Sequence, residues 1–488
     1  MTDARTVIAA LRADGELREE PDALPALTAV TADSRRAVAG ALFCAIEGSA
    51  ADGHAFVADA ARRGAGAALV TRRVPEAAIP QILVRDGRRA AAVAAAAWFG
   101  HPARDLRLVG VTGTNGKSTT VALARHLLNA AGDVGTLGTL GASDGAGTPL
   151  PEDAGLTTPG PVELQAALAT LRARGVRTVV METSSHALHQ RRVHGLAFAG
   201  AVYTNLTHDH LDYHGDYDAY LAAKLLLSEQ LVGPGSIEAV NADDPAWDAL
   251  PSRPGVRRIR FGVQENAEVH ARNVAYGADG AAFLLVCGSE RLPVALPLVG
   301  EFNVSNALGA TAVAWGLGVS ATMIAARLSD APQVPGRLEQ LVGDPFVVLR
   351  DYAHTPDALR RVLRALRPVT QGRLIVLFGA GGDRDRRKRA VMGQVAAHEA
   401  DLAIVTSDNP RTEDPERILD DIEEGFEGVA HVRIADRREA IARALRMVQP
   451  GDTLLLAGKG HETYQVVGTE RLPFDESVIV RDALAATS

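Results

Sequence analysis

The sequence predicts an α/β protein with three domains, two of which contain largely parallel β-sheets. The chain has 488 residues, which is more than one hydrophobic core usually organises. Short apolar runs alternate with helical patterns through most of the chain, as is typical of β-α-β units. Several of these runs end directly in polar or glycine-rich segments. Such segments are expected at the carboxyl ends of parallel strands, where α/β proteins bind their ligands.

The first predicted domain covers residues 1–102. Its β-like runs lie at 41–46, 67–70 and 81–84, among alanine-rich helical segments. The glycine and proline of Gly100-His101-Pro102 predict a hinge at its end.

The second and third predicted domains cover residues 103–334 and 335–488, and the turn Val334-Pro335-Gly336 marks the boundary between them. Apolar runs predict the strands of the second domain at 106–112, 177–181, 198–203, 236–240 and 258–261. Those of the third lie at 346–350, 373–378, 402–406, 431–434 and 453–456, with amphipathic helical patterns at 357–366 and 438–447.

Composition narrows the class of protein. The net charge is −8 and there is no block of basic residues, which argues against nucleic-acid binding. The first twenty residues lack the apolar core of a signal peptide, and no apolar stretch is long enough to cross a bilayer. The two cysteines, Cys44 and Cys287, are far apart, so we expect neither a disulfide framework nor a cysteine metal site. These features predict a cytoplasmic protein that does not insert into membranes.

The segment 108–120, LVGVTGTNGKSTT, predicts a phosphate-binding loop between a strand and a helix at 119–129. Small residues let backbone N–H groups approach phosphate oxygens, while Lys117 suits a phosphate and the Ser118 hydroxyl suits Mg²⁺. The loop from Gly113 is shorter than usual, because Val111 stands where such loops commonly carry a glycine. A glycine turn that merely opens a helix is the alternative. We favour nucleoside triphosphate binding.

Possible metal ligands follow two other strands of the second domain. Glu182 directly follows one strand, which would place it beside the phosphate loop, where it can hold Mg²⁺. The segment 208–214 contains three histidines and two aspartates. A zinc site is one interpretation, but a single imidazole on Mg²⁺ is more economical. Lys224 lies among apolar residues of a helix, and composition alone favours a lysine whose head reaches water.

Four polar loops follow strands of the third domain, at 351–354, 379–385, 407–411 and 458–462. Since ligands bind at the carboxyl ends of parallel strands, we expect these loops to converge on one crevice. Ordinary surface loops are the alternative, but charged or polar side chains at the strand ends weigh against it: Asp351, His354, Arg384, Asp408, Arg411 and Glu462.

Together these motifs resemble those of the Mur ligases of bacterial peptidoglycan synthesis, over nearly the whole chain. The matching segments are Asp33-Ser34-Arg35, GTNGKST, ETSSHAL, TNLTHDHLDYHG, Lys224, Asn303, DYAHTPDAL, GGDRD, DNPR and GKGHE. The resemblance is strongest to the members that add diaminopimelate to UDP-N-acetylmuramoyl-L-alanyl-D-glutamate. It implies a UDP-binding α/β domain, a central P-loop ATPase-like domain and a Rossmann-like domain that receives the amino acid.

The resemblance also implies roles for individual residues. ATP would contact Gly113, Thr114, Asn115, Gly116, Lys117, Ser118, Thr119, Asn303, Arg337 and Asp351. The UDP-sugar dipeptide would contact Ala32, Ser34, Ser49, Ala50, Ala51, Thr157, Thr158, Ser184, Gln190 and Arg192. Diaminopimelate would contact Arg384, Asp408, Asn409, Pro410, Arg411, Gly458 and Glu462. Mg²⁺ would be held by Ser118, Glu182, His210 and Lys224, the last as a carbamate. Lys117, Lys224 and His210 would be the catalytic groups.

The implied reaction is ATP-dependent amide formation through an acyl phosphate, by a monomer that acts on small molecules alone. Three alternatives remain: a folylpolyglutamate synthase, a ligase that adds lysine instead, and a non-catalytic ATP-driven switch. The sequence departs from relatives at Ser118, where threonine is common, and at Leu156, where many have asparagine. Residues 49–51 also lack the polar side chains of some relatives.

Overall fold

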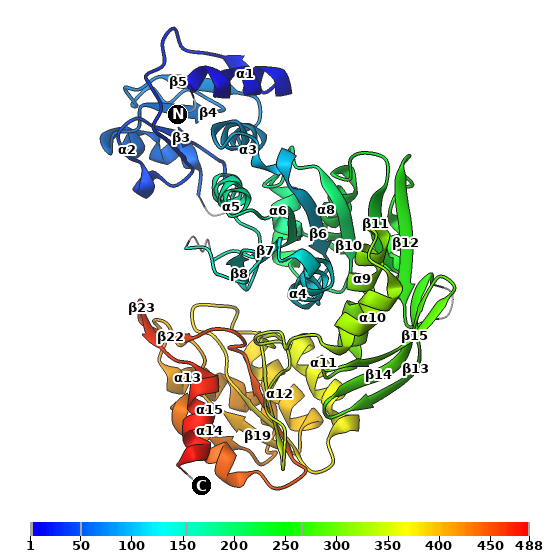
Figure 1. Ribbon diagram of the computed structural model, residues 1–488. Coiled ribbons are helices and arrows are strands. Elements are labelled where there is room, and N and C mark those ends of the chain that lie inside the picture. Colours follow the sequence, from blue (N-terminus) through cyan, green and yellow to red (C-terminus); the bar gives the residue numbers. More distant parts are fainter. Residues whose placement is uncertain (1–2, 49–50, 152–154, 265–266, 487–488) are drawn as a thin grey trace. The chain divides into compact units, whose positions relative to one another are not determined.

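The computed structural model describes residues 3–48, 51–151, 155–264 and 267–486 (Figure 1). It confirms the α/β class, with parallel strands in all three of its larger sheets. The chain divides into two compact units. One comprises residues 1–270, 286–290 and 305–324, and the other residues 271–285, 291–304 and 325–488. The boundaries at 102 and 334 stay predictions.

The first sheet has five strands in the order β1-β5-β4-β3-β2. Its strands are β1 (Leu17–Glu19), β2 (Ala29–Thr31), β3 (Ala41–Cys44), β4 (Ala67–Val70) and β5 (Gln81–Val84). The helices of this region are α1 (Ala4–Asp14), α2 (Val57–Arg62) and α3 (Gly87–Trp98). The three expected strands are confirmed. Strands β1 and β2 were not predicted, because three residues are too few to display a periodic pattern.

The central sheet contains all five strands expected for the second domain. Six strands run parallel in the order β12-β11-β10-β6-β9-β7, followed by the antiparallel β8. Their bounds are β6 (Arg107–Thr112), β7 (Val134–Gly138), β8 (Gly141–Ser143), β9 (Thr178–Glu182), β10 (Phe198–Tyr203), β11 (Ser236–Asn241) and β12 (Val256–Gly262). Beyond β12 the strand order continues with β13 (Val269–Gly277), β14 (Gly280–Cys287) and β15 (Glu290–Leu296), which we did not anticipate.

Helices cover both faces of the parallel strands, which explains why the inner strands β6, β9 and β10 are almost wholly buried. One face packs against α5 (Pro161–Ala173), α6 (Ser185–His189) and α8 (Tyr217–Glu229). Gly309 of α9 (Glu301–Gly316) approaches Val202 and Phe261 of the sheet. The remaining helices are α4 (Lys117–Leu128), α7 (Leu211–His214) and α10 (Ala321–Ser329). None of the helices in the described residues is long and apolar enough to cross a bilayer.

The last large sheet has the order β16-β17-β21-β18-β19-β20. All neighbours are parallel except β16 and β17. Its strands are β16 (Glu339–Val342), β17 (Val347–Asp351), β18 (Leu374–Phe378), β19 (Leu402–Val405), β20 (Val432–Arg433) and β21 (Thr453–Ala457), and the hairpin β22 (Tyr464–Val467) and β23 (Glu470–Pro473) follows them. The five expected strands are confirmed.

This sheet is also covered on both faces. One apolar core joins it to α11 (Pro356–Leu366), α12 (Lys388–Glu399) and α13 (Pro415–Glu423). A second core joins it to α14 (Arg437–Met447) and α15 (Glu476–Ala485). The carboxyl ends of β17, β21, β18 and β19 therefore lie side by side at one edge of the sheet, and the four polar loops begin there.

Candidate nucleotide and amino-acid sites

The predicted phosphate loop joins β6 to α4, as expected, and its shape depends on two glycines. Gly113 has φ +145° and Gly116 has φ +82°, conformations that other residues rarely adopt. A Cβ at Gly113 would lie 1.9 Å from Thr204 Oγ1, and one at Gly116 would lie 2.1 Å from Asn306 Oδ1. Both glycines are therefore required by the packing of the loop. Helix α4 begins at Lys117, two residues earlier than predicted.

The segment that follows β10 supports the phosphate loop from beneath. The Thr114 backbone N–H donates to Asn205 O at 2.7 Å, and the Asn115 N–H donates to Asn205 Oδ1 at 3.0 Å. Thr114 Oγ1 accepts from the Thr207 N–H at 2.9 Å and lies 3.1 Å from Tyr220 Oη. These hydrogen bonds fix the conformation of the phosphate loop. Lys117 Nζ folds back across it, donating to Gly113 O at 3.0 Å and Thr114 O at 2.8 Å.

Two predicted metal ligands meet beside this loop. Ser118 Oγ donates to Glu182 Oε1 at 2.9 Å, and both side chains are buried. Glu182 also accepts from the Thr139 backbone N–H at 2.8 Å. The two ligands come together because their strands, β6 and β9, are neighbours. A hydroxyl and a buried carboxylate are oxygen donors of the kind that Mg²⁺ prefers.

Lys224 differs from the expectation based on composition. Its side chain is 1% exposed, and Nζ donates to Gly113 O at 2.8 Å instead of reaching water. Burial and the nearby positive charge of Lys117 hold the pKa of Lys224 well below its usual range. The prediction of a solvated head is therefore wrong. The lysine lies directly under the phosphate loop, and the carbamate that the family resemblance implied stays a prediction.

His210 lies at the start of α7 with φ +54° and is partly exposed. Burial lowers its pKa, the carboxylate of Asp209 opposes this shift, and Lys117 and Lys224 lower the pKa further, which favours the neutral imidazole that binds metals. Its ring lies 4.7 Å from that of His186. The zinc interpretation of residues 208–214 finds no support: within the described chain, the one group of three possible ligands in mutual reach is elsewhere, at Glu47, Asp52 and His54.

The structure also brings together the residues expected to hold the peptide and the sugar of the nucleotide substrate. Thr158 Oγ1 accepts from the Ser184 N–H at 3.0 Å. Arg192 donates to Thr158 O at 2.7 Å and to Gln190 Oε1 at 2.7 Å. Thr157 Oγ1 accepts from Thr139 Oγ1 at 3.3 Å, which connects this cluster to Glu182 and its neighbours.

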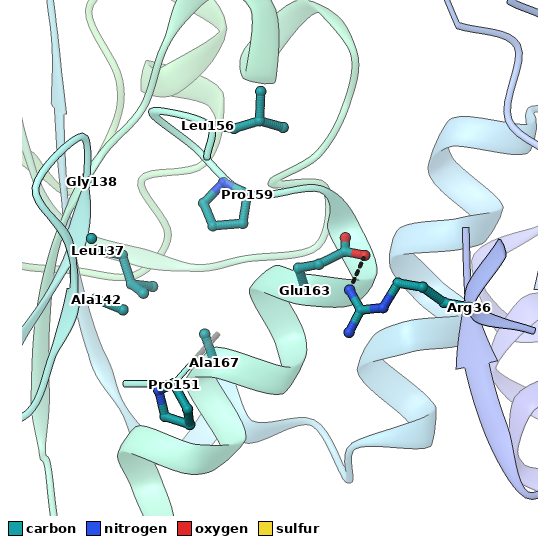
Figure 2. Close-up of a pocket in the computed structure, with 10 residues that line it drawn as sticks. Arg36, Leu137, Gly138, Ala142, Pro151, Leu156, Pro159, Glu163 and Ala167 are labelled. Atoms are coloured by element: carbon teal, nitrogen blue, oxygen red, sulfur yellow. Dashed lines mark ion pairs between the residues drawn. The ribbon is translucent and has the colours of Figure 1, made fainter. Parts of the chain in front are cut away.

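A cavity of about 350 Å³ lies beside this cluster (Figure 2). Arg36 approaches Glu163 across it at 3.9 Å, and Leu156 projects from the loop above. Leu156 is 47% exposed and lines the cavity, so this position presents an apolar side chain where many relatives have asparagine.

The expected UDP contacts near the N-terminus are only partly described. Ser34 is buried at the start of a short 3-10 turn and Ala32 is half-buried, while Ala51 is exposed. Ser49 and Ala50 lie outside the described residues. The UDP-binding roles stay predictions.

The polar loops after β18, β19 and β21 converge, as predicted. Asn409 Nδ2 donates to Glu462 Oε2 at 2.9 Å. A Cβ at Gly458 would lie 2.5 Å from Asp408 Oδ2, so only glycine fits there. Arg411 donates to Gly382 O at 2.8 Å. Side chains far apart in the sequence therefore form one polar cluster at the edge of the sheet.

Arg389 ties two of these loops together and was not anticipated. Its guanidinium is fully buried and contacts both carboxylate oxygens of Glu413, at 2.8 and 2.9 Å. Glu413 accepts from the Asp383 N–H at 2.6 Å, and Asp383 accepts from Thr412 Oγ1 at 2.9 Å. The loop that carries Arg384 is thus fixed against the DNPR segment. Lys459 is a second unanticipated residue, fully buried within the same cluster.

The three residues expected near the adenosine of ATP lie in the second compact unit. Asn303 Nδ2 donates to Val299 O at 2.8 Å. The Asp351 carboxylate accepts backbone N–H groups of Leu338 and Ala353, both at 2.8 Å, and burial raises its pKa. Asp351, the last residue of β17, therefore holds the start of the loop that follows this strand. The guanidinium of Arg337 stacks 4.9 Å from the ring of Tyr352. Their contacts with ATP stay predictions.

Three family models match successive parts of the chain. They are described as "Mur ligase family, catalytic domain" for residues 26–99, "Mur ligase middle domain" for residues 111–314 and "Mur ligase, glutamate ligase domain" for residues 336–460. Their order is that of a three-domain Mur ligase.

Similar proteins cover nearly the same length. A UDP-N-acetylmuramoyl-L-alanyl-D-glutamate–2,6-diaminopimelate ligase of Geobacillus kaustophilus is 42% identical, over 94% of this chain and 95% of that protein. The protein of the same name in Synechococcus elongatus is 45% identical, over 94% of each. A solved structure with this name has a TM-score of 0.67 and 33% identity, covering 96% of this chain and 97% of that one. A folylpolyglutamate synthase of Mycobacterium tuberculosis shares the fold at 18% identity, with a TM-score of 0.62, over 75% of this chain and 91% of that one.

Proposed function

The chain belongs to the Mur ligase family, and on that premise we propose that it joins 2,6-diaminopimelate to UDP-N-acetylmuramoyl-L-alanyl-D-glutamate, with ATP as co-substrate. The observation that carries this proposal is the match to ligases of that name over 94% of the chain. Such a ligase needs a nucleotide site and an amino-acid site. The phosphate loop would supply the first, and the polar cluster at the last large sheet would supply the second. A folylpolyglutamate synthase is disfavoured because the similarity to that enzyme is confined to the fold.

The reaction that fits these sites forms an amide through an acyl phosphate. The D-glutamate side-chain carboxylate attacks the γ-phosphorus of ATP, the bond to the β–γ bridging oxygen breaks, and ADP leaves. Lys117 offsets charge on the transferring phosphoryl group, while the loop glycines let backbone N–H groups face the phosphates. The amine of diaminopimelate then attacks the acyl carbon, and the tetrahedral intermediate collapses with loss of phosphate and a proton. This route requires no side-chain nucleophile.

We propose that Mg²⁺ is held by Ser118, Glu182, His210 and Lys224. The ion would neutralise phosphate charge when bound. Ser118 and Glu182 already meet at 2.9 Å, and the lowered pKa of His210 favours its neutral imidazole. An ammonium on Lys224 would repel a cation, so this role requires a carbamate. The lowered pKa supports that modification, because the neutral amine can attack CO₂, releasing a proton and leaving an anionic oxygen donor.

We also propose that the enzyme works in the cytoplasm as a monomer, on small molecules alone. The net charge of −8 favours neither nucleic acid nor an anionic membrane surface as a partner. Sedimentation at micromolar concentration tests the monomer. A stable dimer would contradict it without affecting the proposed reaction.

The amino acid is tested by measuring phosphate release with a panel of amino acids. Diaminopimelate differs from lysine by a second carboxylate, which the guanidinium of Arg411 can bind through two parallel hydrogen bonds. Lysine would leave that guanidinium without a carboxylate partner. Such a loss typically costs about 2–5 kcal/mol, so we expect roughly 30- to several-thousand-fold preference for diaminopimelate.

Arg411→Ala should remove this preference, whereas the exposed Arg417→Ala in α13 should keep it. Equal use of lysine and diaminopimelate by the unaltered enzyme would refute the amino-acid assignment. Phosphate release that does not depend on both the nucleotide-sugar and an amino acid would instead favour a non-catalytic ATP-driven switch.

A further inference from the structure

Lys459 is a buried cation beneath the polar cluster of the third sheet. It follows β21, and its side chain is 0% exposed. Lysine is rarely buried to this extent, because removing an ammonium group from water is costly unless it is paired. The rings of Tyr464 and Phe474 lie 6.0 and 5.8 Å from Nζ. The ammonium must therefore be stabilised by the polar groups on its other side.

Those groups all belong to the proposed amino-acid site. Lys459 Nζ donates to Asn409 Oδ1 at 3.1 Å and to Glu462 Oε2 at 3.2 Å. It also lies 3.8 Å from Asp408 Oδ1. One cation thus contacts both the loop after β19 and the loop after β21, and its charge offsets that of two carboxylates.

The contacts fix the orientation of the Glu462 carboxylate. Asn409 Nδ2 donates to the same oxygen, Oε2, at 2.9 Å. Asn409 is itself held, because its Oδ1 accepts from the Val466 N–H at 2.8 Å as well as from Lys459. Two donors therefore converge on Oε2 of Glu462, and the position of Oε1 follows from them.

We propose that Lys459 is a positioning residue of the amino-acid site. It anchors Oε2 of Glu462, so that Oε1 accepts a hydrogen bond from an ammonium group of the incoming diamino acid. Its charge also relieves repulsion between Glu462 and Asp408, which keeps both carboxylates in the pocket. Because Lys459 is fully buried, it acts through these residues and does not touch the substrate. The inference rests on the proposed function, since it takes this cluster as the diaminopimelate site.

The test replaces Lys459 with methionine, which keeps the length of the side chain and removes its charge. We expect the KM for diaminopimelate to rise by at least about 30-fold, since one partner of a buried charged pair is lost. The KM values for ATP and the nucleotide-sugar should stay within about two-fold, because their groups are not contacted. Wild-type turnover with diaminopimelate is measured alongside, and its absence would refute the proposed function instead of this inference.

Arg373→Met is the matched control. Arg373 is also a cation paired with a buried aspartate of the same sheet, Asp452, at 2.7 Å. It directly precedes β18 and so lies at the edge opposite the polar loops. This variant can lose stability, but its KM for diaminopimelate should be unchanged.

A double-mutant cycle with Glu462→Gln separates positioning from general damage. If Lys459 acts through Glu462, adding Lys459→Met to Glu462→Gln should raise the KM for diaminopimelate far less than it does in the wild type. If Lys459→Met alone fails to fold, the double variant is compared with Glu462→Gln: a KM for diaminopimelate within about two-fold of that of Glu462→Gln is expected, and a larger rise would overturn the proposal. Equal effects in both backgrounds, or a parallel rise in the KM values of all three substrates, would overturn the proposal. If neither the Lys459→Met chain nor the chain with Lys459→Met and Glu462→Gln folds, the proposal is also overturned, since the residue would then serve the fold alone.

Discussion

Lys117→Ala is expected to eliminate acyl-phosphate formation while the nucleotide-sugar still binds. Lys117 Nζ lies across the phosphate loop, at 2.8 Å from Thr114 O, where it can move onto a γ-phosphate oxygen. Charge on the transferring phosphoryl group would then lack its main protein cation. Removing one such group typically costs on the order of 10²–10³-fold or more in rate.

The measurement is ADP production in single-turnover mixtures, with nucleotide-sugar binding followed by calorimetry. Lys388→Ala is the control. It removes a lysine from α12, which packs on the last large sheet, and this variant should still form ADP. Normal ADP production by the Lys117→Ala chain would exclude Lys117 as the γ-phosphate clamp.

Lys224→Ala is expected to lower ligation nearly to background, and short-chain carboxylates are expected to restore part of it. The truncated side chain leaves space under the phosphate loop, where acetate can replace the anionic oxygen of a carbamate. Lys224→Met fills that space and should show no rescue, which makes it the matched control. Rates are measured across a range of Mg²⁺ concentrations. Unchanged turnover of the alanine variant at limiting Mg²⁺ would remove the metal-binding role.

The sequence was sufficient to predict the strand, loop and helix around Lys117, because that signal is local: an apolar run, glycines and a helical pattern in succession. It also placed Glu182 correctly, since residues that end neighbouring parallel strands must be close. The convergence of the third-domain loops follows from the same rule. Their conformations could not be predicted, because Arg411 has φ +53° and is held by a backbone carbonyl of another loop.

Burial of charged side chains was the main feature that sequence reasoning missed. Lys224 reaches Gly113, 111 positions away in the chain, and nothing in its own helix indicates that contact. Lys459 belongs to a segment that we did recognise, yet its neighbours in sequence give no sign that its ammonium is fully enclosed. A charge is tolerated inside a protein only when distant partners surround it, so its burial is a property of the tertiary structure.

The position of β21 has a consequence for how the enzyme is made. This strand is hydrogen-bonded to β17 on one side and β18 on the other, although both precede it by many residues. While the ribosome is still translating the intervening segment, β17 and β18 expose unpaired apolar edges, which are prone to associate with other chains. A nascent chain paused before residue 453 should therefore depend strongly on chaperones. The amino-acid site would be assembled only when β21 is released and inserted.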